Sequence, residues 1–132
     1  MPVRSSGSSL LRWPDRDEVH AAVVRWAQDL AESRSELLRA GYFGSYARGD
    51  WGVGSDVDLV ILVQRSDDPP FRRAANWPAE RLPGPADVFV YTPEEWAAMD
   101  PDRGFARELR ETTRWVFVRE PEVPMDRSPT GM

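Results

Sequence analysis

Apolar residues recur along residues 15–34 at the spacing of an α-helix. Their intervals of four, three and four residues place them on one face. The residues on this face are Val19, Val23, Trp26 and Leu30. Pro14 and the acidic residues that follow it are typical of a helix start. The pattern predicts a first helix over residues 15–34, after a loose Ser- and Gly-rich arm at residues 1–13.

Four short apolar segments, separated by turn-forming residues, predict four β-strands. They cover residues 36–43, 56–64, 87–91 and 114–119. The second, DVDLVILVQ, is apolar enough for burial on both faces. The intervening sequence predicts one helical turn at 45–49, a proline-rich surface connection at 65–85 with at most one short helix, and helices from 93 and at 103–112.

The length of 132 residues allows one domain, which we expect at residues 14–120 with a solvated tail at 121–132. There is no cysteine and only one histidine, His20, so thiolate and multi-histidine metal sites are excluded within one chain. Any metal ion would therefore be held by oxygen ligands.

Charge and hydropathy narrow the partners further. No apolar run reaches the length of a membrane span and the start lacks a signal peptide, so a cytoplasmic location without membrane contact is expected by default. The net charge is −5, which disfavours broad, charge-driven binding to nucleic acid. All 17 basic residues are arginine, which rules out the lysine-containing phosphate loop GxxxxGK[ST].

The segment from Gly44 to Asp58 carries the candidate chemistry. Asp56 and Asp58 lie two residues apart on the predicted second strand, so both carboxylates, about 6.6 Å apart along the chain, face the same way. Such a pair suits Mg²⁺, which prefers oxygen ligands and nucleotide phosphates. Gly44 and Ser45 lie at a predicted strand-to-helix turn, where free backbone N–H groups favour an anion such as a triphosphate. A phosphate cradle ahead of a dicarboxylate strand is the layout of a two-metal nucleotidyl transfer site.

This segment resembles the signature of the DNA polymerase beta-like nucleotidyltransferases. Gly-Ser, ten residues (46–55) and Asp-x-Asp have the spacing of that superfamily, and FGSYARG followed by SDVDL is especially similar to the minimal nucleotidyltransferases. The resemblance covers about residues 42–62 directly. The expected architecture is α+β with the nucleotidyltransferase fold: a mixed, mostly antiparallel sheet of about four strands, with helices packed on one side.

The resemblance also implies a third metal-binding acid on a neighbouring strand. Asp87 is the candidate because it opens the strand DVFVY after a turn, whereas Asp67, Asp68 and Asp100 lie in predicted loops or at a helix end. Two Mg²⁺ ions would then be held by Asp56 and Asp58, with Asp87 on the second ion, and ATP would be the donor substrate.

Simpler interpretations exist for several of these residues. Gly44 and Ser45 alone would form an ordinary turn. Arg48 is either a surface residue or a phosphate contact, and Ser55 either binds the nucleotide or closes the turn before the strand. Two roles remain open for Trp51 in the glycine-rich loop: its side chain either packs against the protein or lies near the nucleotide.

Function beyond nucleotidyl transfer rests on analogy. Minimal nucleotidyltransferases often act as antitoxins that transfer AMP to a tyrosine of a helical HEPN-type toxin, and a chain this small fits that role. One alternative is a non-catalytic antitoxin or adaptor that acts by binding alone. Another is an enzyme that modifies a small molecule of the aminoglycoside type, which would need an acidic acceptor pocket from a second copy in a homo-oligomer.

Overall fold

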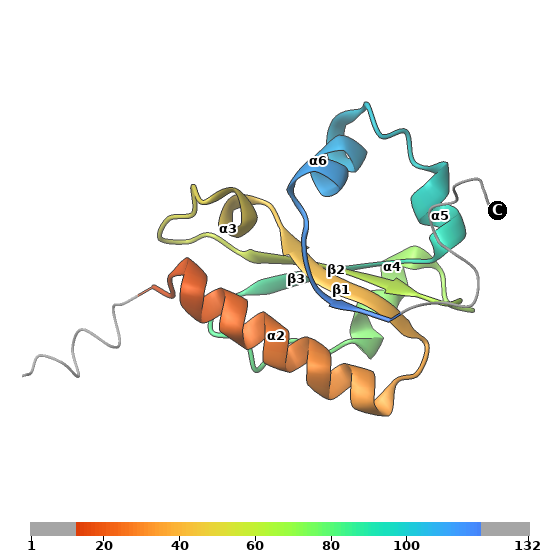
Figure 1. The fold of residues 1–132 in the computed structure, drawn as a ribbon, viewed down its shortest axis with the longest axis horizontal. Coiled ribbons are helices and arrows are strands. Elements are labelled where there is room, and N and C mark those ends of the chain that lie inside the picture. The colour runs from red at the N-terminus through yellow and green to blue at the C-terminus, as the bar shows by residue number, and fades with distance from the viewer. Residues whose placement is uncertain (1–12, 120–132) are drawn as a thin grey trace, which may run out of the picture.

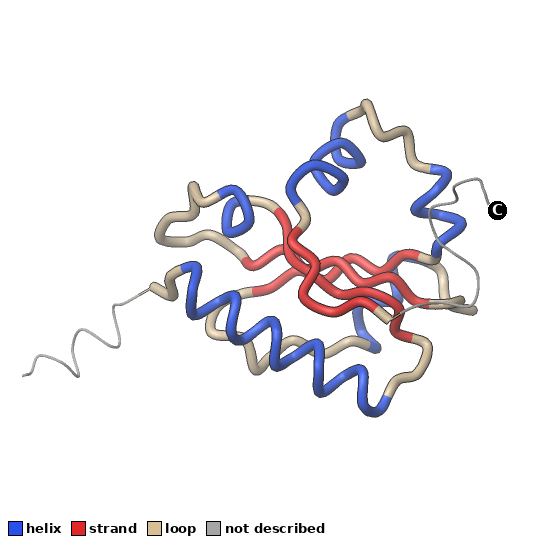
Figure 2. Tube along the Cα trace, viewed as in Figure 1, coloured by secondary structure: helices blue, strands red, loops and turns tan. Residues whose placement is uncertain are grey.

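The computed structural model describes residues 13–119, which form a four-stranded sheet between two layers of helices (Figures 1 and 2). The elements are α2 (Arg16–Ser33), β1 (Leu37–Phe43), α3 (Ser45–Arg48), β2 (Val57–Val63), α4 (Pro70–Arg73), η1 (Ala74–Asn76), β3 (Ala86–Tyr91), α5 (Pro93–Ala98), α6 (Gly104–Thr112) and β4 (Arg114–Val118). The strand order is β3-β2-β1-β4. The β1–β2 and β1–β4 pairs are antiparallel and the β2–β3 pair is parallel. The predicted α+β class and mixed, mostly antiparallel sheet are confirmed.

Helices cover both faces of this sheet, so the expectation that they pack on one side is wrong. α2 lies against one face, whereas α5 and α6 lie over the other (Figure 1). The reason is the composition of the central strands: six of the seven residues are buried in each of β1 and β2. Side chains alternate between the faces of a strand, so both faces are apolar and both must be covered.

The first helix begins and ends within one residue of its predicted bounds. Asp15 is its N-cap: the Asp15 carboxylate accepts a hydrogen bond from the Glu18 N–H, and the Glu18 carboxylate accepts one from the Asp15 N–H. This reciprocal cap satisfies backbone donors that the first turn leaves free. Val19, Val23 and Trp26 from the predicted apolar face are buried against the sheet.

The other predicted segments agree with the structure within about two residues at each end, as is usual at fraying element ends. The surface connection contains the single turn α4, which continues into η1. Trp13, which we placed in the N-terminal arm, packs against the core, so the folded part starts before Pro14. The rest of the arm and the C-terminal tail lie outside the described residues. In residues 13–119, no helix combines the length and apolar character of a membrane span.

Candidate active site

The sheet brings the three predicted acids to one end. Asp58 pairs with Asp87 in the parallel register of β2 and β3, and Asp56 comes directly before β2. Residues two apart on a strand share a face, and Val60 and Phe89, two residues beyond the paired acids, belong to the core layer beneath α5 and α6. The acids therefore lie on the face that α5 and α6 cover.

Gly44 meets Asp58 directly. β1 ends at Phe43, which pairs with Asp58, and Gly44 then turns the chain into α3 with a φ of 77°. A Cβ atom at Gly44 would overlap the Asp58 Oδ2 atom. The position thus requires glycine for its backbone conformation and for the space that the carboxylate occupies. α3 begins at the next residue, Ser45.

Asp58 lies in a negative electrostatic environment. Burial is the largest cause that raises its pKa to about 6, and the charges of Asp87, Asp56 and Glu108 raise it further. The charge of Arg48 opposes this shift, but its effect on the pKa is smaller than that of each of the three carboxylates. Both the partial burial and the neighbouring carboxylates favour the protonated form of Asp58 unless a cation balances the charge.

Arg48 is held by two carboxylates. Its Nε atom lies 3.1 Å from the Asp50 Oδ2 atom, and its Nη1 atom donates to the Glu108 carboxylate on α6. Arg48 was predicted to be either a surface residue or a phosphate contact, and in the structure it links α3 to α6. Sequence reasoning missed Glu108, because no local pattern shows that α6 returns to α3.

Ser55 and Trp51 each interact with a residue close to them in the sequence. The Gly52 N–H donates to the Ser55 hydroxyl oxygen at 2.9 Å, so Ser55 closes the turn before β2, and nucleotide binding by Ser55 stays a prediction. Trp51 stacks on Tyr46 with ring centroids 5.4 Å apart and nearly parallel planes. The Tyr46 hydroxyl in turn donates to the Pro14 carbonyl. The glycine-rich loop is therefore attached to the start of α2.

Three aromatic rings pack together on the sheet face that carries the acids, and sequence reasoning missed this cluster as well. Phe43 lies 5.5 Å from Phe105 between ring centroids, and Phe89 lies 5.2 Å from Phe105. Phe105, at the start of α6, remains 44% exposed. A partial signal was available, since Phe43 immediately precedes Gly44 and Phe89 lies two residues after Asp87. The position of Phe105 depends on tertiary packing alone.

The acids fit a hard divalent cation by their chemistry and backbone placement. All three offer carboxylate oxygens, and Asp56 and Asp87 are exposed while Asp58 is half-buried. Within residues 13–119, however, no three acidic or histidine side chains converge on one point that could hold a metal ion. Asp58 and Asp87 are nevertheless register partners on adjacent strands, so their side chains start from neighbouring backbone positions.

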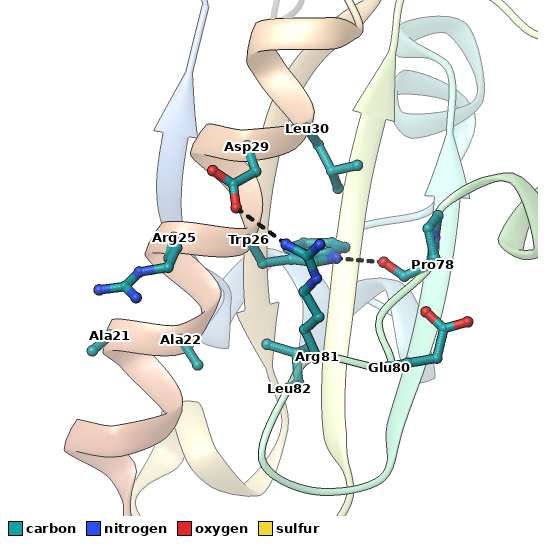
Figure 3. A pocket seen from close by; sticks show the side chains of 10 residues that line it. All are labelled: Ala21, Ala22, Arg25, Trp26, Asp29, Leu30, Pro78, Glu80, Arg81 and Leu82. Atoms are coloured by element: carbon teal, nitrogen blue, oxygen red, sulfur yellow. Dashed lines mark hydrogen bonds and ion pairs between the residues drawn. The ribbon is translucent and has the colours of Figure 1, made fainter.

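A separate groove lies on the opposite face of the sheet (Figure 3). It has a volume of about 630 Å³ and runs between α2 and residues 78–82. The Trp26 indole donates to the Pro78 carbonyl at 2.7 Å, and Arg81 lies 3.9 Å from Asp29 across it. None of the predicted site residues lines this groove, so its size does not make it the reaction site.

The sequence of residues 25–123 matches the family of nucleotidyltransferase domains. The chain belongs to this family. The predicted family relationship is thereby confirmed. The matched region contains the Gly44–Asp58 segment and Asp87, whose roles remain those predicted from the sequence.

Solved structures agree with this nucleotidyltransferase at the level of fold. One is a Sulfolobus solfataricus protein to which nucleotidyltransferase function has been ascribed, with a TM-score of 0.54 and 20% identity over 82% of this chain and 91% of that chain. Another belongs to a toxin-antitoxin complex with AMP-PNP, with a TM-score of 0.52 and 16% identity over 76% of this chain and 74% of that chain. No curated protein matched the sequence.

Proposed function

We propose that this nucleotidyltransferase transfers AMP from ATP to a protein hydroxyl group in a Mg²⁺-dependent reaction. The observation that carries the proposal is the pairing of Asp58 with Asp87 on adjacent strands, with Asp56 beside them and Gly44 against the Asp58 carboxylate. Clustered carboxylates next to a helix start are costly unless they bind a cation and the anion that accompanies it.

The residues divide the reaction between them. Asp56, Asp58 and Asp87 would hold Mg²⁺, which when bound offsets phosphate charge and lowers the pKa of the acceptor hydroxyl. Ser45 and the backbone N–H groups beside Gly44 orient the triphosphate. The acceptor oxygen forms a bond to the α-phosphorus, the bond from this phosphorus to the bridging oxygen breaks, and pyrophosphate leaves with the electron pair. Asp87, the exposed acid of the pair, takes the proton of the acceptor.

The proposed acceptor is a tyrosine of a HEPN-type toxin, for which this chain would be the antitoxin. Support comes from analogy: the chain resembles minimal nucleotidyltransferases at FGSYARG and SDVDL, and a protein of similar fold belongs to a toxin-antitoxin complex with AMP-PNP. The shared fold alone does not fix the substrate.

Label transfer tests the proposal. The purified protein is incubated with α-labelled ATP and Mg²⁺, with and without the helical protein encoded beside it, and the label is followed by gel. We expect label on the partner with the wild type and with Asp67→Asn, a matched change of an exposed loop acid outside the site. Asp56→Asn should abolish it. Neutralisation of the partner by Asp56→Asn without any label would contradict transfer and establish the binding-only alternative.

A further inference from the structure

The outer edge of β3 is open next to Asp87. The Val57 N–H donates to the Pro85 carbonyl, so the backbone groups of Pro85 and, by alternation along the strand, of Asp87 and Phe89 point toward β2. The Arg73 guanidinium donates to the Val90 carbonyl from the side of β3 that faces away from β2. The backbone N–H and C=O groups of Val90 therefore point away from the sheet. By the same alternation, the backbone N–H and C=O groups of Ala86 and Val88 also point away from the sheet. Within residues 13–119, these groups form no hydrogen bond. Unpaired groups of this kind are a template for another strand.

A hollow of about 640 Å³ adjoins this open edge. It lies between β3 and the segment that starts with η1, and both Asp87 and Val88 line it. Among residues 13–119, Glu80 and Asp87 are the only charged residues that line the hollow, so it favours a basic occupant. In contrast to the groove of Figure 3, it is continuous with the acids of the candidate active site.

We propose that the free edge of β3 is the acceptor site of this enzyme, and that it binds an extended, basic segment of a protein as an added strand. The inference rests on the proposed transfer reaction and adds where and in what form the acceptor binds. Main-chain hydrogen bonds to Ala86 and Val88 would fix the register, as in other cases of strand addition. A residue that faces Asp87 across adjacent strands has its Cβ atom about 5 Å away, so its hydroxyl group reaches the Asp87 carboxylate.

This placement explains how the acceptor oxygen and the triphosphate approach from different sides. Gly44 and Ser45 lie beyond β2, on the β1 side of Asp58, whereas the added strand would lie beyond β3, on the far side of Asp87. The strand positions of Asp58 and Asp87 lie between these two sites, and both substrates would extend over them to meet. The acceptor hydroxyl then donates its proton to Asp87 as its oxygen bonds to the α-phosphorus and pyrophosphate departs.

Two variants and one matched control test the acceptor site. Val88→Pro removes an outward N–H and blocks pairing on this edge, a change that edge strands tolerate. Ala75→Trp fills the hollow from an exposed position on η1 without a change in β3. The control is Val118→Pro on the opposite edge strand. The backbone groups of Val118 also point away from the sheet. The reason is that the next residue, Arg119, donates its N–H to the Leu38 carbonyl of β1, and the backbone direction alternates along a strand.

The probes are three pools of blocked nine-residue peptides, each peptide with one central Tyr, Ser or Thr. In the Arg pool the flanking residues are Val and Arg, and in the Glu pool they are Val and Glu. The third pool is the Arg pool with N-methylated backbone amides. The partner protein of the preceding experiment is assayed in parallel. We expect transfer to the Arg pool to exceed transfer to the other two pools. Val88→Pro and Ala75→Trp should lower kcat/KM for peptide and partner about tenfold, the effect of one or two lost hydrogen bonds, with KM for ATP unchanged. Val118→Pro should behave as the wild type.

The failures of the two proposals are distinguishable. Wild-type transfer that Val88→Pro and Ala75→Trp leave unchanged would overturn the acceptor site while the transfer reaction stands. If the wild type labels no acceptor, the proposed function fails, and the edge is then examined by the NMR amide signals of Ala86 and Val88 during titration with the Arg pool. Unchanged signals would overturn the strand-addition site as well. A change from dimer to monomer in Val88→Pro would show that a second copy occupies the edge, and would also overturn it.

Discussion

At the scale of single residues, Gly44 has the most constrained position in the candidate site. Gly44→Ala places a Cβ atom against the Asp58 Oδ2 atom and also requires a positive φ. We expect loss of transfer and a fall of about 2–3 kcal/mol in the free energy of unfolding, the sum of backbone strain and overpacking. Gly54→Ala is the matched control, since Gly54 also has a positive φ but no atom within 4 Å of the added Cβ.

The measurement is urea unfolding of both variants beside the label-transfer assay. Gly54→Ala should lose only about 1 kcal/mol of stability, from backbone strain, and keep its activity. Equal effects of the two substitutions on activity would show that the contact between Gly44 and Asp58 has no part in the reaction.

Asp58 makes stability depend on pH in the absence of divalent metal. Its pKa in the folded protein, about 6, exceeds the ordinary value of 3.8, so the folded state binds more protons than the unfolded state between these values. Stability therefore falls as pH rises from about 4 to 6, and the loss is complete above that window. The shift corresponds to about 3 kcal/mol, which solvent screening of a half-exposed group reduces to about 1 kcal/mol.

Asp58→Asn should consequently be inactive and yet more stable than the wild type by about 1 kcal/mol at pH 7.5 in EDTA. Near pH 4, where Asp58 is protonated in the folded state, the two proteins should have similar stability. Urea unfolding across this range measures the difference, with Asp67→Asn as the control at an exposed acid. A variant that is less stable than the wild type at pH 7.5 would contradict the electrostatic account.

At the scale of elements, Arg73 connects α4 to β3 and α5. Its side chain is only 6% exposed, and it donates to the Asp68 and Val90 carbonyls and, through two nitrogen atoms, to the Glu95 carboxylate. This guanidinium lowers the pKa of Glu95, so the pair stabilises the fold above the ordinary pKa of Glu95 and ceases to do so as pH falls through the lowered value.

Arg73→Ala should therefore lower the free energy of unfolding at neutral pH by about 2–3 kcal/mol, because it leaves buried acceptors and a carboxylate unpaired. The neighbouring Arg72 is exposed, and Arg72→Ala should change stability by no more than about 0.5 kcal/mol. Thermal unfolding of both variants checks the contrast. Similar small losses from both would mean that the interactions of Arg73 contribute little to stability.

The elements themselves were largely readable from the sequence, because periodicity and caps are local. The apolar face of α2, the start of α2 next to Pro14 and the start of α5 at Pro93 lie where the pattern places them. The side of the sheet on which each helix packs was not readable in the same way. It could still have been inferred for this chain: the apolar run from Val57 to Val63 already required cover on both faces.

At the scale of the whole molecule, the candidate site combines local and distant contributions. Gly44, Asp56 and Asp58 belong to one short segment, so their spacing was visible in the sequence, and Asp87 followed from its place at a strand start. The contributions of α6 were not visible, since Glu108 and Phe105 reach the site only through the packing of α6 over the sheet. The metal-binding role of the acids remains a prediction.

If the three acids bind Mg²⁺ in the folded state, Mg²⁺ should raise the free energy of unfolding of the whole protein as well as support activity. A ligand that binds the folded state alone adds about 2.7 kcal/mol to the free energy of unfolding at a hundredfold excess over Kd. We expect Mg²⁺ to raise Tm by several degrees beyond NaCl of equal ionic strength in the wild type and in Asp67→Asn, and much less in Asp58→Asn or Asp87→Asn. The rise should diminish as pH falls below about 6, because Asp58 must lose its proton to bind the ion. An equal rise in all four proteins would show that Mg²⁺ acts through the general charge of −5 and not at these carboxylates.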